Sequence, residues 1–177
     1  MMKTMVLVKK ILLGETMKKV IKSFLKVIVN WMVSLARNFR IGRYVYEQIL
    51  DGSMSQTKEV DHSGIKLKFS VPNSLSNYRA DSFSTKEPET LEWIDAMQEG
   101  SVVWDIGANV GIYSCYAAKR RNCRVFSFEP SVFNLELLAR NIFLNGLTKR
   151  VTIVPLPLSD VLSLNSLNMT STAWGGA

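Results

Sequence analysis

Histidine and cysteine are scarce in this 177-residue sequence, and their scarcity excludes a zinc site built from them and a disulfide framework. His62 is the only histidine, and Cys115 and Cys123 are the only cysteines. A structural zinc site needs four nitrogen, sulfur or oxygen ligands held together, and these three residues do not assemble one. We expect both thiols to be buried and reduced, and His62 to be exposed beside a turn rather than catalytic.

Long apolar segments are also missing. No stretch approaches 18 apolar residues without a charge, which is about the length that a membrane-spanning helix needs. The early apolar run at residues 5–13 is interrupted by Lys9 and Lys10, and no small-residue cleavage pattern follows it, so it is a poor signal peptide. We therefore expect a cytoplasmic protein whose contact with a membrane, if it makes one, is peripheral.

Acidic residues are almost absent from the first quarter of the chain. Residues 1–46 contain ten lysines and arginines but only one acid, Glu15, so this segment carries a charge of +9. The whole chain carries +7, which leaves −2 for the remainder. A basic segment is therefore joined to a slightly acidic one, and the two are expected to have different roles.

A polar stripe follows one side of a predicted helix in the basic segment. Polar residues recur at every fourth position and apolar residues fill the positions between them, which is typical of an amphipathic helix with a wide apolar face. The stripe consists of Lys18, Lys22, Lys26, Asn30 and Ser34, and the apolar face includes Phe24 and Trp31.

Three kinds of partner fit this helix over residues 18–40. Lysines beside aromatic and aliphatic side chains suit the surface of an anionic membrane. The same face suits packing on the rest of the chain or on a second subunit, and we favour packing because most amphipathic helices bury their apolar side in protein. Nucleic acid fits least, because no recognised nucleic-acid module accompanies the helix and the remainder of the chain is not basic.

Residues 102–118 follow the pattern of a strand, a tight loop and a helix. A short apolar run ends near Asp105, two glycines stand four positions apart at Gly107 and Gly111, and helical spacing then resumes. The glycines have no Cβ, so a ligand can approach the main chain and the helix can lie close to the strand. Asp105 falls at the carboxyl end of the strand, which is the edge where open α/β sheets bind ligands.

The spacing of this loop distinguishes between two kinds of nucleotide cofactor. A dinucleotide fingerprint reads Gly-x-Gly-x-x-Gly and cradles a pyrophosphate, whereas this loop reads Gly-Ala-Asn-Val-Gly after an acid that repels phosphate. S-adenosylmethionine has no phosphate, and its ammonium and sulfonium cations are attracted to a carboxylate. The alternative is a β-α turn that needs glycine but binds no ligand. The predicted contacts of S-adenosylmethionine are Asp105, Gly107, Ala108, Asn109 and Gly111.

A second acid ends the next apolar run. Glu129 follows the run at residues 125–128 and lies eighteen positions beyond Gly111, where a carboxylate is placed to accept hydrogen bonds from both ribose hydroxyls of an adenosine cofactor. Taken alone, Glu129 is equally an acid at the start of the helix that Pro130 opens. Because Asp105 occupies the matching place in the preceding strand, we predict that Glu129 binds the ribose.

A third acid follows the strand expected at residues 151–155. Asp160 falls at the same edge of the sheet, where its carboxylate is placed to accept a hydrogen bond from the adenine amino group. An aspartate in an ordinary turn is the alternative interpretation.

Four stretches of the sequence are considered together. They are Asp105-Ile-Gly-Ala-Asn-Val-Gly-Ile-Tyr-Ser, Phe128-Glu-Pro-Ser, Asn141-x-x-x-Asn145-Gly-Leu and Phe83-Ser-Thr-Lys-Glu-Pro-Glu-Thr. The set resembles the FkbM-type family of S-adenosylmethionine-dependent methyltransferases. The loop alone indicates the wider methyltransferase superfamily, and the order and spacing of the whole set point to FkbM. The resemblance implies an α/β fold with the doubly wound, Rossmann-like sheet of class I methyltransferases, over about residues 61–177.

The resemblance adds two second-rank candidates for the cofactor site. In the family the segment at residues 83–90 lies beside the cofactor, which makes Thr85 and Glu87 candidates for contact with its methionine end. Without the family, hydroxyl and acidic residues ahead of Leu91 are those of a well-capped helix start, and we prefer this interpretation.

The resemblance also implies a seven-stranded sheet, and only about three of its strands precede Ala177 by their apolar pattern. We therefore expect an incomplete sheet and a truncated domain. The chain divides into a basic helical segment (1–50), a linker with a small strand region and a capped helix (51–100), and the cofactor-binding half of a methyltransferase domain (101–177).

FkbM-type enzymes methylate hydroxyl groups of sugars or polyketide-like metabolites, so the resemblance implies a small-molecule hydroxyl acceptor. Transfer to an alcohol usually needs a base, which is expected in the missing strands, so no catalytic residue is assigned. Two other functions fit the sequence. One is a non-catalytic, membrane-associated remnant that acts through its N-terminal helix, and the other is an enzyme that binds NAD or a nucleotide sugar.

Overall fold

A computed structural model describes residues 2–161, 166–169 and 171–176, with side chains from residue 16 onward. The chain forms two compact units, Met1–Asp51 and Gly52–Ala177. The side chains of the early apolar run at 5–13, and residues 162–165 and 170 of the polar tail, lie outside this description.

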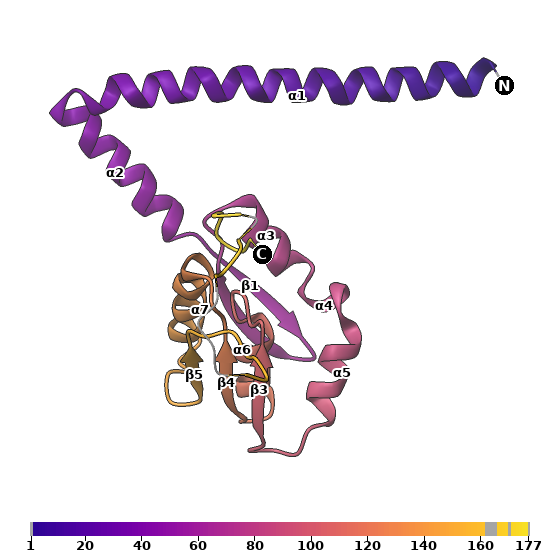
Figure 1. Cartoon of the computed structure of the whole chain (residues 1–177), viewed down its shortest axis with the longest axis vertical. Coiled ribbons are helices and arrows are strands. Elements are labelled where there is room, and N and C mark those ends of the chain that lie inside the picture. The colour runs from indigo at the N-terminus through magenta and orange to yellow at the C-terminus, as the bar shows by residue number, and fades with distance from the viewer. Residues whose placement is uncertain (1, 162–165, 170, 177) are drawn as a thin grey trace. The chain divides into compact units, whose positions relative to one another are not determined.

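The first unit is helical. Helix α1 runs over Met2–Arg37, and after a short turn α2 runs over Arg40–Met54 (Figure 1). Residues 18–37 of the expected amphipathic segment belong to α1, whereas the prediction up to residue 40 is wrong, because a turn at residues 38–39 separates α1 from α2. Among the described residues, no helix combines the length and the apolar character that crossing a membrane requires.

The second unit begins with a hairpin and three short helices. Strands β1 (Thr57–His62) and β2 (Ile65–Ser70) pair antiparallel, and every second residue of β2 points into the protein, as its alternating sequence predicts. Helices α3 (Ser74–Asp81), α4 (Phe83–Lys86) and α5 (Pro88–Ala96) follow.

A parallel sheet with crossover helices forms the centre of this unit. Its order is β3-β4-β5, and α6 and α7 make the crossovers, which is the βαβαβ half of a Rossmann-like fold (Figure 1). The predicted α/β class is confirmed. The elements are β3 (Val102–Ile106), α6 (Ile112–Arg120), β4 (Arg124–Phe128), α7 (Val132–Leu144) and β5 (Val151–Val154).

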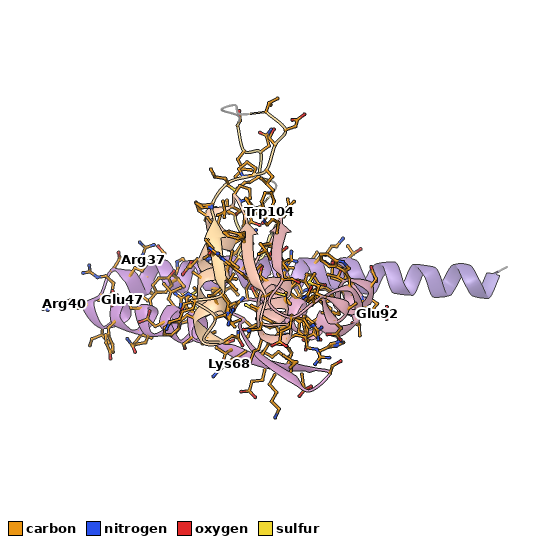
Figure 2. All side chains as sticks on the ribbon, turned by 90° about the horizontal axis from the view of Figure 1, so that it is seen from below. Arg37, Arg40, Glu47, Lys68, Glu92 and Trp104 are labelled. Carbon is orange, nitrogen blue, oxygen red and sulfur yellow. The ribbon has the colours of Figure 1, made fainter. Side chains whose placement is uncertain are left out.

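The helices cover only one face of the sheet. On the covered face Val103 and Val125 are buried. The β3 side chains of the opposite face are exposed, at 61% for Val102, 61% for Trp104 and 63% for Ile106 (Trp104 is labelled in Figure 2). Among the described residues no helix lies over this second face, which a doubly wound sheet would bury. The sheet is therefore incomplete, as the sequence predicts.

Asn141 of α7 and Asn145, the C-cap residue of that helix, attach the hairpin to the remainder of the unit. Asn141 accepts a hydrogen bond from the Ser70 N–H at 2.8 Å and donates one to the Val110 carbonyl at 2.8 Å. Asn145 accepts one from the Lys68 N–H at 2.9 Å and donates one to the Lys68 carbonyl at 2.8 Å. The motif Asn-x-x-x-Asn thus places two amides on one helix face, where they pair with β2 as a neighbouring strand would.

The cysteines are free and buried, as predicted. Burial raises the pKa of the Cys115 thiol to about 12, so the thiol stays protonated and inert. His62 differs from the expectation, because it is half-buried rather than exposed. Its ring packs edge-on against Phe83 and Tyr116, and its Nδ1 lies 3.1 Å from the Ser84 hydroxyl, which gives it a packing role at the end of β1.

Candidate functional site

The loop between β3 and α6 contains three residues with left-handed backbone conformations. The φ angle is +78° at Gly107, +51° at Asn109 and +75° at Gly111. Glycine adopts these angles without steric cost, and asparagine tolerates them better than most residues. The loop ends at Gly111, which is the N-cap of α6.

Every backbone N–H of this loop already has an acceptor within the protein. The N–H groups of Gly107 and Ala108 both donate to the Phe128 carbonyl. The N–H of Asn109 donates to the Glu129 carboxylate, and the N–H of Val110 donates to the Asn109 side chain. The N–H of Gly111 donates to the Ala108 carbonyl. A dinucleotide-binding loop uses such amides to hold a pyrophosphate. This loop therefore has no free amide to offer a phosphate.

Asp105 lies where β3 ends, between α6 and a cavity. Its Oδ2 accepts a hydrogen bond from the Ser114 hydroxyl of α6, and the Ser127 hydroxyl of β4 lies 2.6 Å from that same group. Burial raises the pKa of Asp105, the Ser114 hydrogen bond opposes this effect, and the charge of Glu129 raises the pKa further. A carboxylate held in such surroundings is stabilised when a cation binds beside it.

The cavity has a volume of about 450 Å³ and lies between the loop, α6 and the helices α3 to α5. Its size falls within the range of small-molecule sites. Five of the predicted contact residues line it. These are Asp105, Gly107, Ala108, Asn109 and Glu87.

Glu129 lies at the same edge of the sheet as Asp105, because Asp105 pairs in register with Ser127. Its carboxylate accepts hydrogen bonds from the N–H groups of Asn109 and Ser131, both at 2.8 Å, and the residue is 5% exposed. Glu129 thus holds the glycine loop in place, and it is not among the residues that line the cavity. An ionised carboxylate can accept about four hydrogen bonds, and Glu129 already accepts two. Two lone pairs remain for the ribose hydroxyls, and ribose binding stays a prediction.

The other predicted contacts also lie outside the cavity lining. Gly111 supports the loop from the N-terminus of α6. Thr85 is exposed on α4, and its hydroxyl lies 3.4 Å from the Ser82 carbonyl. Asp160 is exposed after β5, where the Ser159 hydroxyl donates to it at 3.3 Å. Their contact with the cofactor stays a prediction.

The start of α5 differs from the predicted hydroxyl cap. Glu87 is the N-cap residue, its side chain makes no capping hydrogen bond, and Pro88 opens the helix. Proline is favoured at the first helical position because its φ is already helical and it has no N–H to satisfy. Glu87 is instead free to face the cavity, and its side chain forms an ion pair with Lys86 at 3.0 Å.

Several residues of the site escaped sequence reasoning. Ser114, Tyr113 and Arg79 all line the cavity. Burial and the charge of Glu87 raise the pKa of Tyr113 to about 12, so this phenol is protonated at neutral pH and is no general base. Ser114 stands nine positions after Asp105, in the first turn of α6, and that spacing is the signal that could have found it.

The C-terminal residues lie beside the loop and α7. The Gly176 carbonyl accepts hydrogen bonds from the side-chain amides of Asn134 at 2.8 Å and Asn109 at 3.2 Å. Arg79 Nε donates to the Gly175 carbonyl at 2.9 Å. The side chain of Asn109 is therefore directed away from its own backbone N–H and toward this segment.

We expect Gly111→Ala to destabilise the unit more than Gly107→Ala does. A Cβ on Gly111 would lie 2.1 Å from Leu138 Cδ1, in a fully buried side chain, whereas a Cβ on Gly107 would meet nothing within 4 Å. Both positions have φ near +75°, so both substitutions carry about 1 kcal/mol of backbone strain. Overpacking adds about 1 to 3 kcal/mol at Gly111 alone. Urea unfolding of the two variants measures the difference, and equal losses would contradict the close packing of α6 on α7.

Comparison with known proteins gives one sequence relative and several structural likenesses. No model of a protein family matches the chain. The hexuronic acid methyltransferase AglP of Haloferax volcanii is 24% identical over 90 residues, which cover 51% of this chain and 37% of that protein. This chain is thus related in sequence to a methyltransferase, over little more than a third of that protein's length.

Two of the solved structures illustrate the structural likenesses. An S-adenosylmethionine-dependent methyltransferase of Agrobacterium tumefaciens is 13% identical with a TM-score of 0.43, over 57% of this chain and 32% of that one. TYW2 of P. horikoshii, in complex with MeSAdo, is 19% identical with a TM-score of 0.42, over 57% of this chain and 36% of that one.

Proposed function

We propose that this chain is the cofactor-binding part of an S-adenosylmethionine-dependent methyltransferase of the FkbM type. The acceptor is a hydroxyl group of a small molecule, either a sugar or a polyketide-like metabolite. The sequence relationship to a methyltransferase that acts on a hexuronic acid supports the sugar class.

One observation carries the proposal. The end of β3 presents the Asp105 carboxylate to the cavity, and the loop that follows has satisfied all of its own backbone amides. This combination attracts a cationic ligand and offers no loop amide to a pyrophosphate, which favours S-adenosylmethionine over NAD or a nucleotide sugar.

The residues of this chain then have separate roles. Asp105 attracts the positively charged part of the cofactor, and the Ser127 to Ser114 hydroxyl chain donates to its carboxylate and fixes the orientation of that group. Glu129 and Asn141 hold two adjacent residues of the loop, Asn109 and Val110. S-adenosylmethionine, when bound, supplies the methyl group. The chain contributes alignment and exclusion of water, which are the main contributions of an enzyme to a methyl transfer.

Isothermal titration calorimetry of the full chain with S-adenosylmethionine and, separately, with NAD tests this function. We expect a saturable heat with S-adenosylmethionine and none with NAD. Tighter binding of NAD would overturn the proposal in favour of a dinucleotide enzyme. Binding of neither ligand by a chain that is folded by circular dichroism would favour the non-catalytic remnant.

A further inference from the structure

We propose that residues 16–37 of helix α1 bind the surface of a membrane that contains anionic lipids, with the helix axis in the membrane plane. This inference concerns the first unit alone and does not rest on the methyltransferase function. It is carried by three properties of the helix, which are its exposed apolar residues, their separation from the lysines, and its charge.

The apolar residues of this helix are exposed. Phe24 and Trp31 are 65% and 66% exposed, and no side chain described between residues 16 and 51 is buried, so α1 and α2 do not cover each other within their unit. Exposed aliphatic and aromatic side chains on this scale mark an interaction surface. The exposed apolar residues of the helix are Met17, Val20, Ile21, Phe24, Leu25, Val27, Ile28, Val29, Trp31, Met32 and Leu35.

The apolar and basic residues occupy different sides of the helix. At 3.6 residues per turn, Val20, Phe24 and Trp31 share one side with most of the aliphatic residues, whereas Lys22 and Lys26 share the opposite side with the small polar residues. The apolar side covers about 160° of the circumference, which is wider than the seam of a coiled coil. A wide apolar face with aromatic residues and lysines is the pattern of a helix that lies in a membrane interface.

The charge of the segment selects the occupant of this face. A second copy would bring another segment of +9 against the first, and the two would repel. An anionic lipid surface attracts the same charges, and Arg37 and Arg40 at the corner between α1 and α2 extend the basic region (Figure 2). Burial of the apolar face in protein, which the sequence alone favoured, would leave the lysines of the opposite side in water, whereas an anionic surface attracts them.

Co-sedimentation of the full chain with vesicles tests the proposal. We expect binding to vesicles of phosphatidylcholine with phosphatidylglycerol, no binding to phosphatidylcholine alone, and a decrease with added salt. The triple variant Lys18→Gln, Lys22→Gln, Lys26→Gln should bind about 100-fold more weakly, because each lysine near an anionic surface contributes about a factor of five. The double variant Phe24→Ser, Trp31→Ser should lose binding altogether.

Matched variants in the second unit provide the controls. Lys66→Gln, Lys68→Gln, Lys149→Gln makes the same change of net charge, and Val132→Ser, Phe143→Ser removes apolar residues that are 65% and 74% exposed. Both controls should bind as the parent chain does. Equal binding to both kinds of vesicle, or equal loss in the control variants, would overturn the proposal. Absence of binding together with a dimer in sedimentation analysis that Phe24→Ser, Trp31→Ser dissolves would assign the face to a second copy instead.

Discussion

Replacement of Asp105 with asparagine is expected to weaken the binding of S-adenosylmethionine by about 10- to 100-fold, because a hydrogen bond or close contact to an ionised group contributes about 1.5 to 3 kcal/mol. Asparagine has nearly the same shape and its Oδ1 can still accept the Ser114 hydrogen bond, so the main change is the loss of the negative charge, with one carboxylate oxygen replaced by an NH2 group. The fold should not suffer. Burial already disfavours the ionised form of Asp105, as its raised pKa indicates, so the melting temperature of the variant should equal or exceed that of the parent. Calorimetry and thermal unfolding measure the two effects.

The pH dependence of binding provides a second measurement on the same residue. The pKa of Asp105 is raised above its ordinary value of 3.8, so the folded protein holds this proton to a higher pH than the unfolded chain does. Protonation therefore favours folding, and this contribution to stability is lost as the pH rises through the folded-state pKa. Binding of the cation has the opposite dependence, and its affinity should fall as the pH is lowered through the same pKa.

Two variants separate charge at the site from charge elsewhere. Asp105→Asn should bind with an affinity that falls less over the acidic range than that of the parent, because the carboxyl group at this position is gone. Glu99→Gln, which changes an exposed acid ahead of β3, should retain the affinity and the pH dependence of the parent. An affinity that falls equally in both variants would show that the overall charge of the unit, and not Asp105, attracts the cofactor.

Replacement of Asn141 with leucine is expected to cost about 4 kcal/mol of folding stability. The side chain is fully buried and joins the Ser70 N–H of β2 to the Val110 carbonyl of the glycine loop. The variant leaves both backbone groups buried without a partner, at about 1 to 3 kcal/mol each. Urea unfolding measures the loss, and the affinity for S-adenosylmethionine should fall as well, because Val110 is one of the residues that line the cavity.

Asn145 provides a matched control on the same helix. It makes two equivalent hydrogen bonds to Lys68, but Lys68 is exposed, so water can replace the lost amide. Asn145→Leu should therefore cost less than about 1 kcal/mol. Equal losses at the two positions would mean that the attachment of β2 depends on contacts other than these amides.

Sequence reasoning located the strands, the loop and the acids at the sheet edge because each has a local cause. An apolar run of four or five residues, a pair of glycines that adopt left-handed angles, and an acid at the end of a strand are all visible in short windows. Contact with S-adenosylmethionine stays a prediction at each of these residues. The start of α5 was missed because a hydroxyl cap and a proline are both signals for the first residue of a helix. Both signals occur between Ser84 and Pro88, and the helix begins at the proline.

The residues that sequence reasoning missed lie far apart in the chain. Arg79 reaches the cavity from α3, and Asn141 reaches the loop from α7. The half-buried state of His62 likewise results from contact with Tyr116 on α6. No local pattern distinguishes an asparagine that binds a distant backbone from one on a helix surface.

The sequence by itself determined the α/β class, the basic N-terminal helix and the acid-ended strand before the glycine loop, because these depend on the order of neighbouring residues. Only the tertiary structure decided that the loop amides are all satisfied, that Glu129 braces the loop, and that the apolar face of α1 is not covered by α2. The physical reason is that a hydrogen bond or a buried surface needs a partner, and the partner's position is set by the packing of the whole chain.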